Sequence, residues 1–148
     1  MKQLIRCALI LAFLAGSGYG VDKISWFNDM DAAMAAAKRE NKPLMIDFMA
    51  DWCAPCKEME RSTFSNSTVI LKAKSFISVR IDIDKQRKVA EKYKALARAY
   101  GGVGIPNMLF LSPNGTKIHH KVGFFTSQQL LPVMDSVLKT SRQSKAKK

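Results

Sequence analysis

Residues 47–60 read DFMADWCAPCKEME and contain the two features that decide the fold, the end of a buried strand and a cysteine pair. The apolar run over residues 44–50 is short and nearly continuous, which predicts a strand covered on both faces. Cys53 and Cys56 follow at once and open a predicted helix over residues 53–64. Because a helix N-terminus carries partial positive charge and free N–H groups, it stabilises a thiolate. We therefore expect an exposed, activated Cys53 thiol and a Cys56 thiol one turn further in.

The first twenty residues predict an export signal. Lys2 and Arg6 supply positive charge, an uninterrupted apolar run fills residues 7–15, and small residues follow it. The run is too short to span a bilayer, which takes ~20 residues, although an uncleaved anchor is the alternative. The expected organisation is a signal peptide at residues 1–20, a folded domain at residues 21–140 and a basic flexible tail at residues 141–148.

Removal of the signal takes away Cys7 and leaves a lone cysteine pair, Cys53 and Cys56. A pair this close closes too small a loop to stabilise an exported fold. Three explanations remain: a redox pair, half of a zinc site, or chance. Zinc takes four ligands, and the two candidate histidines, His119 and His120, are neighbours on a predicted strand and face opposite ways. We therefore favour a redox pair and expect neither a metal nor a cofactor.

Hydrophobic spacing predicts the remaining elements. Thr126 and Gln129 form a capping box for the last helix, and Ser112–Gly115 suits a hairpin turn. The expected elements are a short strand at 25–27, a helix capped by Asn28 at 29–40, the strand at 44–50, the helix at 53–64, a short helix or turn at 66–75, a strand at 77–84, a helix at 85–100 ended by Gly101 and Gly102, strands at 107–111 and 117–125, and a final helix containing Pro132. This order predicts an α/β fold, a central mixed sheet with helices on both faces.

The chain carries a formal net charge of +12, and five of its basic residues lie between Lys139 and Lys148, where no acid stands. Such a tail can bind nucleic acid or anionic lipid, and the alternative is a solvated end that aids solubility. Export would separate the protein from nucleic acid. We therefore favour the solvated end and expect no nucleic-acid partner.

Two separated motifs carry a family resemblance. Trp52-Cys53-Ala54-Pro55-Cys56-Lys57 resembles the active-site signature of the thioredoxins, and Gly104-Ile105-Pro106 resembles their cis-proline loop. Residues 47–60, with Thr63-Phe64, are also similar to the C-terminal thioredoxin-like domain of DsbD, a transmembrane reductase, although Pro55 departs from that domain's pattern. The resemblance spans about Trp26 to Leu138 and implies a thioredoxin fold. It also implies that the peptide bond before Pro106 is cis and that Pro106 packs beside the sulfurs; an ordinary trans turn is the alternative. It implies further that the Ile105 backbone pairs with a substrate segment. Together with Trp52, which we expect to shield the site, these are the expected substrate-binding residues.

Two acids near the cysteines are candidate site residues. Asp47 interrupts an apolar strand, and burial would raise its pKa and suit it to proton transfer with the thiols; the matching thioredoxin position is a buried aspartate. Glu60 lies seven residues after Cys53 and four after Cys56, so a rotation of ~100° per residue returns it to their side of the helix. There it could modulate the thiol pKa, as the resemblance to the DsbD domain implies. The alternatives are a polar edge position for Asp47 and an exposed carboxylate beside Arg61 for Glu60.

These residues predict an exported, periplasmic thiol–disulfide oxidoreductase that forms a mixed disulfide on Cys53, which Cys56 resolves. Ala54 and Pro55 offer no donor to stabilise the thiolate, so the couple should resemble thioredoxin near ~−270 mV and not DsbA near ~−120 mV. We expect a monomeric reductase of exported proteins, recharged by a membrane electron donor of the DsbD type because the chain has no nicotinamide or flavin motif. The alternatives are an oxidase or isomerase on the same fold, a reductase dedicated to cytochrome c maturation, and a non-catalytic basic binding module.

Overall fold

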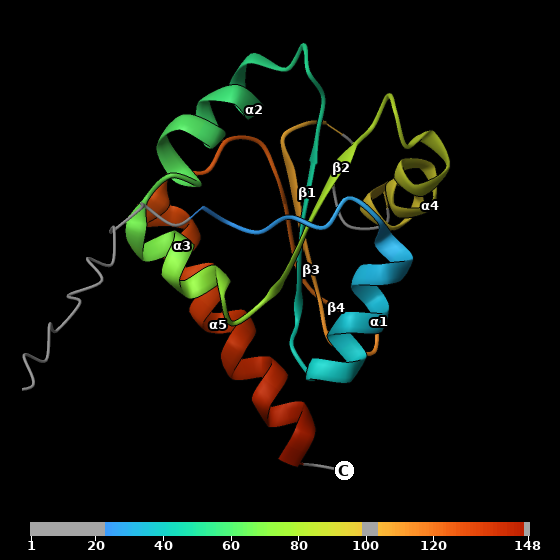
Figure 1. Ribbon diagram of the computed structural model, residues 1–148, viewed down its shortest axis with the longest axis vertical. Coiled ribbons are helices and arrows are strands. Elements are labelled where there is room, and N and C mark those ends of the chain that lie inside the picture. Colours follow the sequence, from blue (N-terminus) through green and yellow to red (C-terminus); the bar gives the residue numbers. More distant parts are fainter. Residues whose placement is uncertain (1–22, 99–103, 147–148) are drawn as a thin grey trace, which may run out of the picture.

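The computed structural model describes residues 23–98 and 104–146. Its helices and strands follow the order α1 (Met30–Glu40), β1 (Leu44–Met49), α2 (Ala54–Glu58), the π-helical turn η1 (Met59–Thr63), α3 (Ser67–Ala73), β2 (Ile77–Asp82), α4 (Arg87–Arg98), β3 (Asn107–Leu111), β4 (Lys117–Val122) and α5 (Ser127–Ala146) (Figure 1). The expected signal peptide at residues 1–20, the two glycines at 101 and 102, and residues 147–148 of the expected tail lie outside the described residues. Within the described ranges, no helix is long and apolar enough to cross a membrane.

The four described strands form one mixed sheet in the order β2-β1-β3-β4. β1 runs parallel to β2 and antiparallel to β3, and β3 pairs antiparallel with β4. Figure 1 shows α1 and α4 on one side of this sheet and α2, α3 and α5 on the other. The predicted α/β class, with a central mixed sheet between helices, is therefore confirmed.

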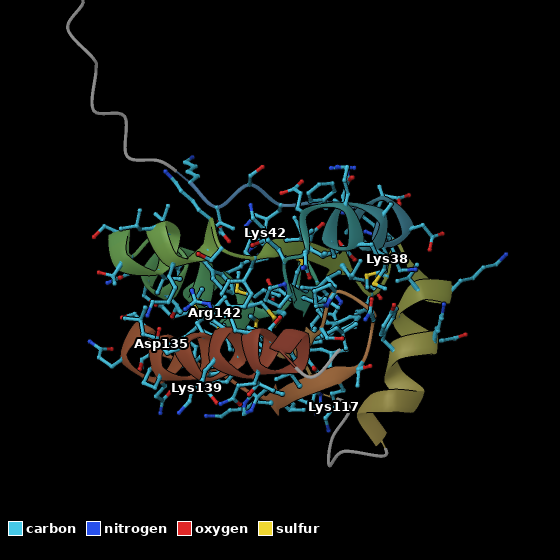
Figure 2. All side chains as sticks on the ribbon, turned by 90° about the horizontal axis from the view of Figure 1, so that it is seen from below. Lys38, Lys42, Lys117, Asp135, Lys139 and Arg142 are labelled. Carbon is cyan, nitrogen blue, oxygen red and sulfur yellow. A yellow bond between two sulfur atoms is a disulfide. The ribbon has the colours of Figure 1, made fainter. Side chains whose placement is uncertain are left out.

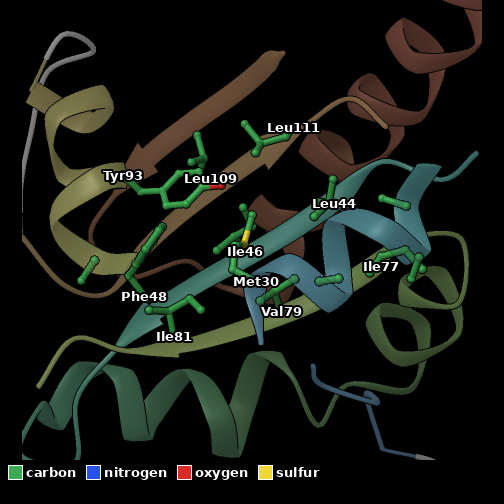
Figure 3. Close-up of a cluster of buried hydrophobic side chains, with 14 residues drawn as sticks. Met30, Leu44, Ile46, Phe48, Ile77, Val79, Ile81, Tyr93, Leu109 and Leu111 are labelled. Carbon is green, nitrogen blue, oxygen red and sulfur yellow. The ribbon is translucent and has the colours of Figure 1, made fainter. Parts of the chain in front are cut away.

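The two faces of the sheet have separate hydrophobic cores. Alternate residues of β1 point to opposite faces, so Leu44, Ile46 and Phe48 pack on the α1 and α4 side (Figure 3). Met45 packs into the second core, beside residues of η1, α3, β3 and α5. Both faces of β1 are thus covered, which explains its continuous apolar run. By the same alternation, Asp47 lies on the face covered by α2 and η1.

Two local predictions at the N-terminal end are wrong. The expected strand at 25–27 is reduced to an isolated parallel bridge between Phe27 and Val79. α1 is capped by Asp29 and not by Asn28, because the extended Asp29 backbone lets its carboxylate accept a hydrogen bond from the Ala32 N–H at 2.7 Å.

The C-terminal elements follow the prediction with shifted ends. β4 ends at Val122 and not at 125, since Gly123 has a φ of 101° and turns the chain out of the sheet. The capping box is confirmed by two reciprocal bonds, from the Thr126 N–H to Gln129 Oε1 at 3.1 Å and from the Gln129 N–H to Thr126 Oγ1 at 3.3 Å. α5 then continues to Ala146, past residue 141 where the tail was expected to begin.

Candidate redox site

A disulfide joins Cys53 to Cys56 where β1 gives way to α2. Cys53 is the N-cap of α2, with extended backbone, and the Cys56 N–H donates a hydrogen bond to Cys53 Sγ at 3.2 Å. In the reduced protein the same N–H would face a thiolate, and a hydrogen bond to an anionic sulfur is stronger than one to a neutral sulfur. The local backbone therefore favours ionisation of Cys53.

The expected exposure of Cys53 is wrong. Its exposed fraction is 3%, against 6% for Cys56. The pair forms a small apolar cluster with Ala50, and the partly buried Ile83 and Ile105 pack against it. The prediction failed because a helix start on its own is open to solvent, whereas here side chains from elsewhere in the chain cover it.

The loop before β3 supplies part of that cover. The Ile105–Pro106 peptide bond is cis, and Pro106 and Asn107 are buried. The Pro106 carbonyl accepts a hydrogen bond from the Gly123 N–H at 2.8 Å, which ties the loop to the end of β4. A cavity of about 240 Å³ opens beside Ile105, between this loop and α4. The structure therefore brings the predicted residue Ile105 to the cysteines, and the predicted cis-proline Pro106 follows it directly in the chain.

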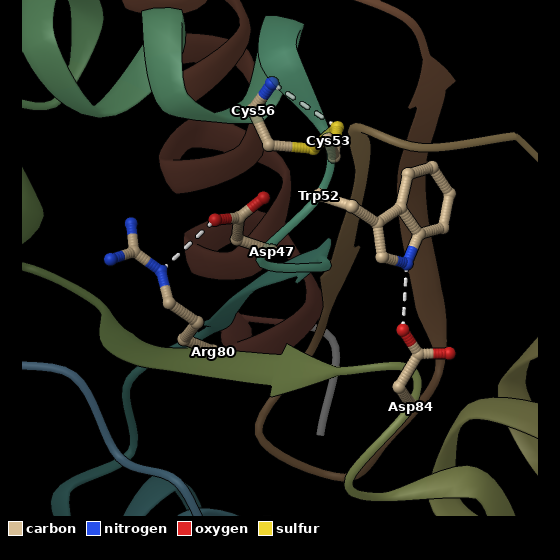
Figure 4. Close-up of a disulfide and its surroundings, with 6 residues drawn as sticks. All are labelled: Asp47, Trp52, Cys53, Cys56, Arg80 and Asp84. Carbon is tan, nitrogen blue, oxygen red and sulfur yellow. Dashed lines mark hydrogen bonds and ion pairs between the residues drawn. A yellow bond between two sulfur atoms is a disulfide. The ribbon is translucent and has the colours of Figure 1, made fainter.

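Trp52 stands at the surface beside the disulfide, with 65% of the residue exposed. Its indole Nε1–H donates a hydrogen bond to Asp84 Oδ2 at 2.7 Å, just beyond β2 (Figure 4). Next to it, Lys85 bridges Asp51 at 2.7 Å and Asp82 at 3.0 Å. These contacts fasten the Cys53 loop to the segment after β2 and fix the position of the indole.

Asp47 lies in β1 beneath the disulfide, and its exposed fraction is 3%. Arg80 Nε donates to Asp47 Oδ2 at 3.2 Å, whereas Oδ1 is buried without a hydrogen-bond partner. Figure 4 shows the carboxylate between Arg80 and the cysteines, with the unpaired oxygen turned toward the sulfurs. Burial raises the pKa of Asp47 from 3.8 to about 6, even though Arg80 opposes the rise. A carboxyl with this pKa and a free oxygen can exchange a proton near neutral pH.

Glu60 reaches this network through Arg80. Glu60 Oε2 accepts a hydrogen bond from Arg80 Nη2 at 2.5 Å, while about half of the Glu60 side chain remains exposed. The negative charge of Glu60 contributes to the raised pKa of Asp47. The alternative partner, Arg61, pairs with Glu58 at 2.7 Å. The carboxylate of Glu60 is thus joined to Asp47 by a shared cation.

Sequence reasoning missed Arg80. Its guanidinium carbon lies 4.2 Å from the ring centroid of Trp26 and 5.4 Å from that of Phe64, so two aromatic rings hold it. Asp47 and Arg80 are direct neighbours in the parallel pairing of β1 and β2. The available signals were the single charge inside the apolar strand β1 and the arginine in the middle of β2, although a two-strand register is needed to pair them.

The two histidines have separate surroundings, as expected from their alternation along β4. His120 Nε2 shares a hydrogen bond of 2.8 Å with Asn107 Oδ1, and His119 packs against Phe110. Burial, aided by Lys117 and Lys121, lowers the pKa of His119. In the part of the chain that the structure describes, no group of three or more His, Cys, Asp or Glu side chains could hold a metal ion.

Comparisons with known proteins agree with this geometry. The model of a family described as a thioredoxin-like domain matches residues 30–138. The thiol:disulfide interchange protein DsbD of Vibrio cholerae is 33% identical over 112 residues, which cover 74% of this chain but only 18% of that protein. The oxidised C-terminal domain of DsbD from Neisseria meningitidis is 28% identical, with a TM-score of 0.58 over 75% of this chain and 97% of that one. A thioredoxin from Thermus thermophilus has a TM-score of 0.64 at 21% identity, over 79% of this chain and 88% of that one, which bears on the fold alone.

Proposed function

The chain belongs to the thioredoxin-like family, and on that premise we propose that it is an exported reductase of protein disulfides. The observation that carries the proposal is a Cys53–Cys56 disulfide at the start of a helix, above a buried carboxylate with one unpaired oxygen. A cysteine pair placed only to stabilise the fold would not need a proton acceptor beneath it. The relative in Vibrio cholerae is a thiol:disulfide interchange protein, which supports the same class of reaction.

In the proposed reaction, the reduced protein attacks first through Cys53. Its thiolate forms a bond with one sulfur of the partner disulfide, the partner's S–S bond breaks, and the released thiolate takes a proton from water. Asp47 then accepts the proton of Cys56, whose thiolate attacks the Cys53 sulfur and expels the second partner thiolate, which is protonated in turn. Two electrons pass from the cysteine pair to the partner.

The other predicted residues take supporting roles in this proposal. Glu60 modulates the pKa of Asp47 through Arg80, and through Asp47 that of the thiols. The backbone of Ile105 pairs with the partner segment, and Trp52 and Pro106 flank the sulfurs there. This assignment replaces direct contact between Glu60 and the sulfurs with a path through an intervening cation.

The direction of electron flow follows from what surrounds Cys53. The residues between the cysteines, Ala54 and Pro55, add no side-chain donor to the Cys56 N–H bond. A less stabilised thiolate makes the disulfide harder to reduce, so we place the couple near thioredoxin at ~−270 mV. The expected signal peptide at residues 1–20 leads us to place the protein in the periplasm, as a monomer that receives electrons from a membrane donor of the DsbD type.

A trapping experiment tests the proposal. The Cys56→Ser variant should accumulate a mixed disulfide with a disulfide-containing protein such as insulin, because the resolving thiol is missing. The Cys53→Ser variant should form no mixed disulfide, because it lacks the attacking thiol. A non-catalytic binding module would bind its partner equally well with Cys53→Ser and would form no mixed disulfide.

The reduction potential of the wild-type couple, measured against glutathione or dithiothreitol, tests the direction. A value near or below ~−250 mV supports a reductase. A value above ~−180 mV would reverse the proposed electron flow and favour an oxidase or isomerase.

A further inference from the structure

The end of the molecule opposite the disulfide gathers positive charge from segments far apart in the sequence. α1 and α5 both end there, and β1 and β4 begin there, so that Figure 2 looks directly onto this end. We call this end the basic pole, and its cations are Lys38 and Arg39 of α1, Lys42 before β1, Lys117 of β4, and Lys139 and Arg142 of α5.

The carboxylates at the basic pole offset only part of this positive charge. Glu40 pairs with Arg39 and Lys42, both at 3.1 Å, and Asp135 pairs with Lys72. Lys38, Lys139 and Arg142 are exposed. Cations in the last turn of a helix also offset its negative C-terminal dipole, which explains Lys38 and Arg39 of α1. Lys42 follows the end of α1 directly, so the same dipole acts on it, whereas Lys117 lies in β4 and is not explained in this way.

The end that carries the disulfide has a different charge pattern. Three of its lysine and arginine side chains pair with carboxylates, while Lys57 is exposed: Lys85 bridges two aspartates, Arg61 pairs with Glu58, and Arg80 pairs with Glu60. Charge is therefore separated along the long axis of the domain. A molecule with this separation turns its positive end toward an extended anionic surface.

A hollow of about 310 Å³ adjoins the basic pole between α3 and the segment before α1. Its lining combines three lysines and one carboxylate, Glu40, with apolar side chains; the lysines are Lys23, Lys42 and Lys74, and the apolar residues include Ile70, Phe76 and Ile77. Cations beside apolar surface match the boundary between lipid headgroups and acyl chains. A nucleic acid offers phosphates but nothing to occupy an apolar wall.

We infer that the basic pole docks onto a bilayer of anionic phospholipid. The broad, multi-element surface fits a plane of negative headgroups, and the attraction depends on the number of cations that reach it. In this orientation the Cys53–Cys56 pair, at the other end, faces away from the bilayer and stays open to protein partners. The inference stands apart from the proposed reductase activity, since it rests on the placement of charge and on the hollow beside the basic pole.

The test compares vesicles made of equal parts phosphatidylglycerol and phosphatidylcholine with vesicles of phosphatidylcholine only, by co-sedimentation of the full chain. The readout is the difference between the two vesicle types, because the apolar residues 7–15 could bind either one. We expect Lys38→Gln, Lys139→Gln and Arg142→Gln together to weaken the phosphatidylglycerol-dependent binding about 100-fold, since each basic side chain near an anionic surface contributes about fivefold. All three are exposed, so their replacement leaves the core intact.

A matched variant removes three exposed lysines elsewhere, Lys57, Lys88 and Lys92, each replaced by Gln. It should retain most of the phosphatidylglycerol-dependent binding. Equal loss in both triple variants, or equal wild-type binding to the two vesicle types, would overturn the inference. Tighter binding of the wild-type protein to duplex DNA than to anionic vesicles at the same salt concentration would also overturn it.

The orientation has a separate readout. The rate at which iodoacetamide alkylates Cys53 in the reduced protein should be the same with and without saturating anionic vesicles. Slower alkylation would place the disulfide end against the bilayer and contradict docking through the basic pole. A protein whose cysteine pair has no reductase activity would give the same results in the vesicle and DNA binding tests. Failure of the proposed function and failure of this inference are therefore distinguishable.

Discussion

Replacement of Arg80 by methionine tests how the site sets the pKa of Asp47. Arg80 Nε lies 3.2 Å from Asp47 Oδ2 and is the cation that opposes the effect of burial. Two unit charges about 4 Å apart interact with about 4 kcal/mol at an effective dielectric constant of about 20. This is an upper bound, because water can enter the space that the guanidinium leaves. A neighbouring arginine lowers a carboxyl pKa by about 1–3, so we expect Arg80→Met to move the pKa of Asp47 from about 6 to about 7–9.

The assay is a ¹³C NMR titration of the Asp47 carboxyl in the oxidised protein, in which the cysteines do not titrate. In the reduced protein, the pH dependence of mixed-disulfide resolution should shift upward by the same amount, because Cys56 loses its proton to an ionised Asp47. At pH 7 the ionised fraction of Asp47 falls from about 0.9 at a pKa of about 6 to about 0.5 at about 7 and about 0.1 at about 8, so resolution slows about twofold for the first rise of 1 and up to about tenfold for each further rise.

Two further variants separate this effect from general damage. Arg80→Lys keeps the positive charge and should move the pKa of Asp47 less than Arg80→Met does. Arg61→Met removes an arginine that pairs with Glu58 and should leave the titration of Asp47 unchanged. The reasoning is refuted if the pKa of Asp47 stays near 6 or falls in a folded Arg80→Met protein.

Three other substitutions have defined outcomes. The folded protein raises the pKa of Asp47 from 3.8 to about 6, so it binds the Asp47 proton more tightly than the unfolded chain does. The protonated carboxyl therefore contributes its full share to the free energy of unfolding below pH ~4, and this contribution is lost as the pH rises through ~6. Asp47→Asn should therefore raise the free energy of unfolding at pH 7.5 by up to about 3 kcal/mol, and urea unfolding that shows a pH-independent difference from wild type would contradict it. Glu60→Gln should lower the pKa of Asp47 by about 0.5, a small change because the Glu60 side chain is half exposed. An upward shift of this pKa in the same NMR titration would contradict the path from Glu60 through Arg80. Thr126→Ala removes the side-chain cap of α5 and should cost about 1 kcal/mol, seen as a lower Tm with an unaltered reduction potential.

The fold could be predicted because its strongest signals are local. The continuous apolar run of β1, the capping box at Thr126 and the turn at Ser112–Gly115 each depend on residues close together in the chain. Their order then restricts the topology to a mixed sheet between helices. The segment at 25–27 failed as a strand because its pairing is limited to one bridge with β2, which local spacing does not reveal.

The candidate site was predictable in its reactive groups and not in their surroundings. The cysteine motif located the disulfide, and a lone acid in an apolar strand located Asp47. The burial of Cys53 depends on Ile83 and Ile105, which lie thirty residues or more further along the chain. Arg80 requires the register of β1 against β2, in which a shift of one residue would turn its side chain to the other face. Contacts of this kind come from the assembled sheet.

The π-helical turn η1 changes the direction in which side chains point in the second half of the helix after the disulfide, relative to those in the first half. The Phe64 N–H donates to the Met59 carbonyl at 2.8 Å, one residue further back than an α-helix allows. The extra residue rotates whatever follows by about 100° relative to the cysteines. Thr63 and Phe64 thereby meet the Phe125 carbonyl and the Trp26 ring. Deletion of one residue in η1 would leave the sequence of the cysteine motif unchanged but would rotate Thr63 and Phe64 by about 100° relative to the cysteines. The disulfide and the Phe64 ring could then no longer both face the sheet.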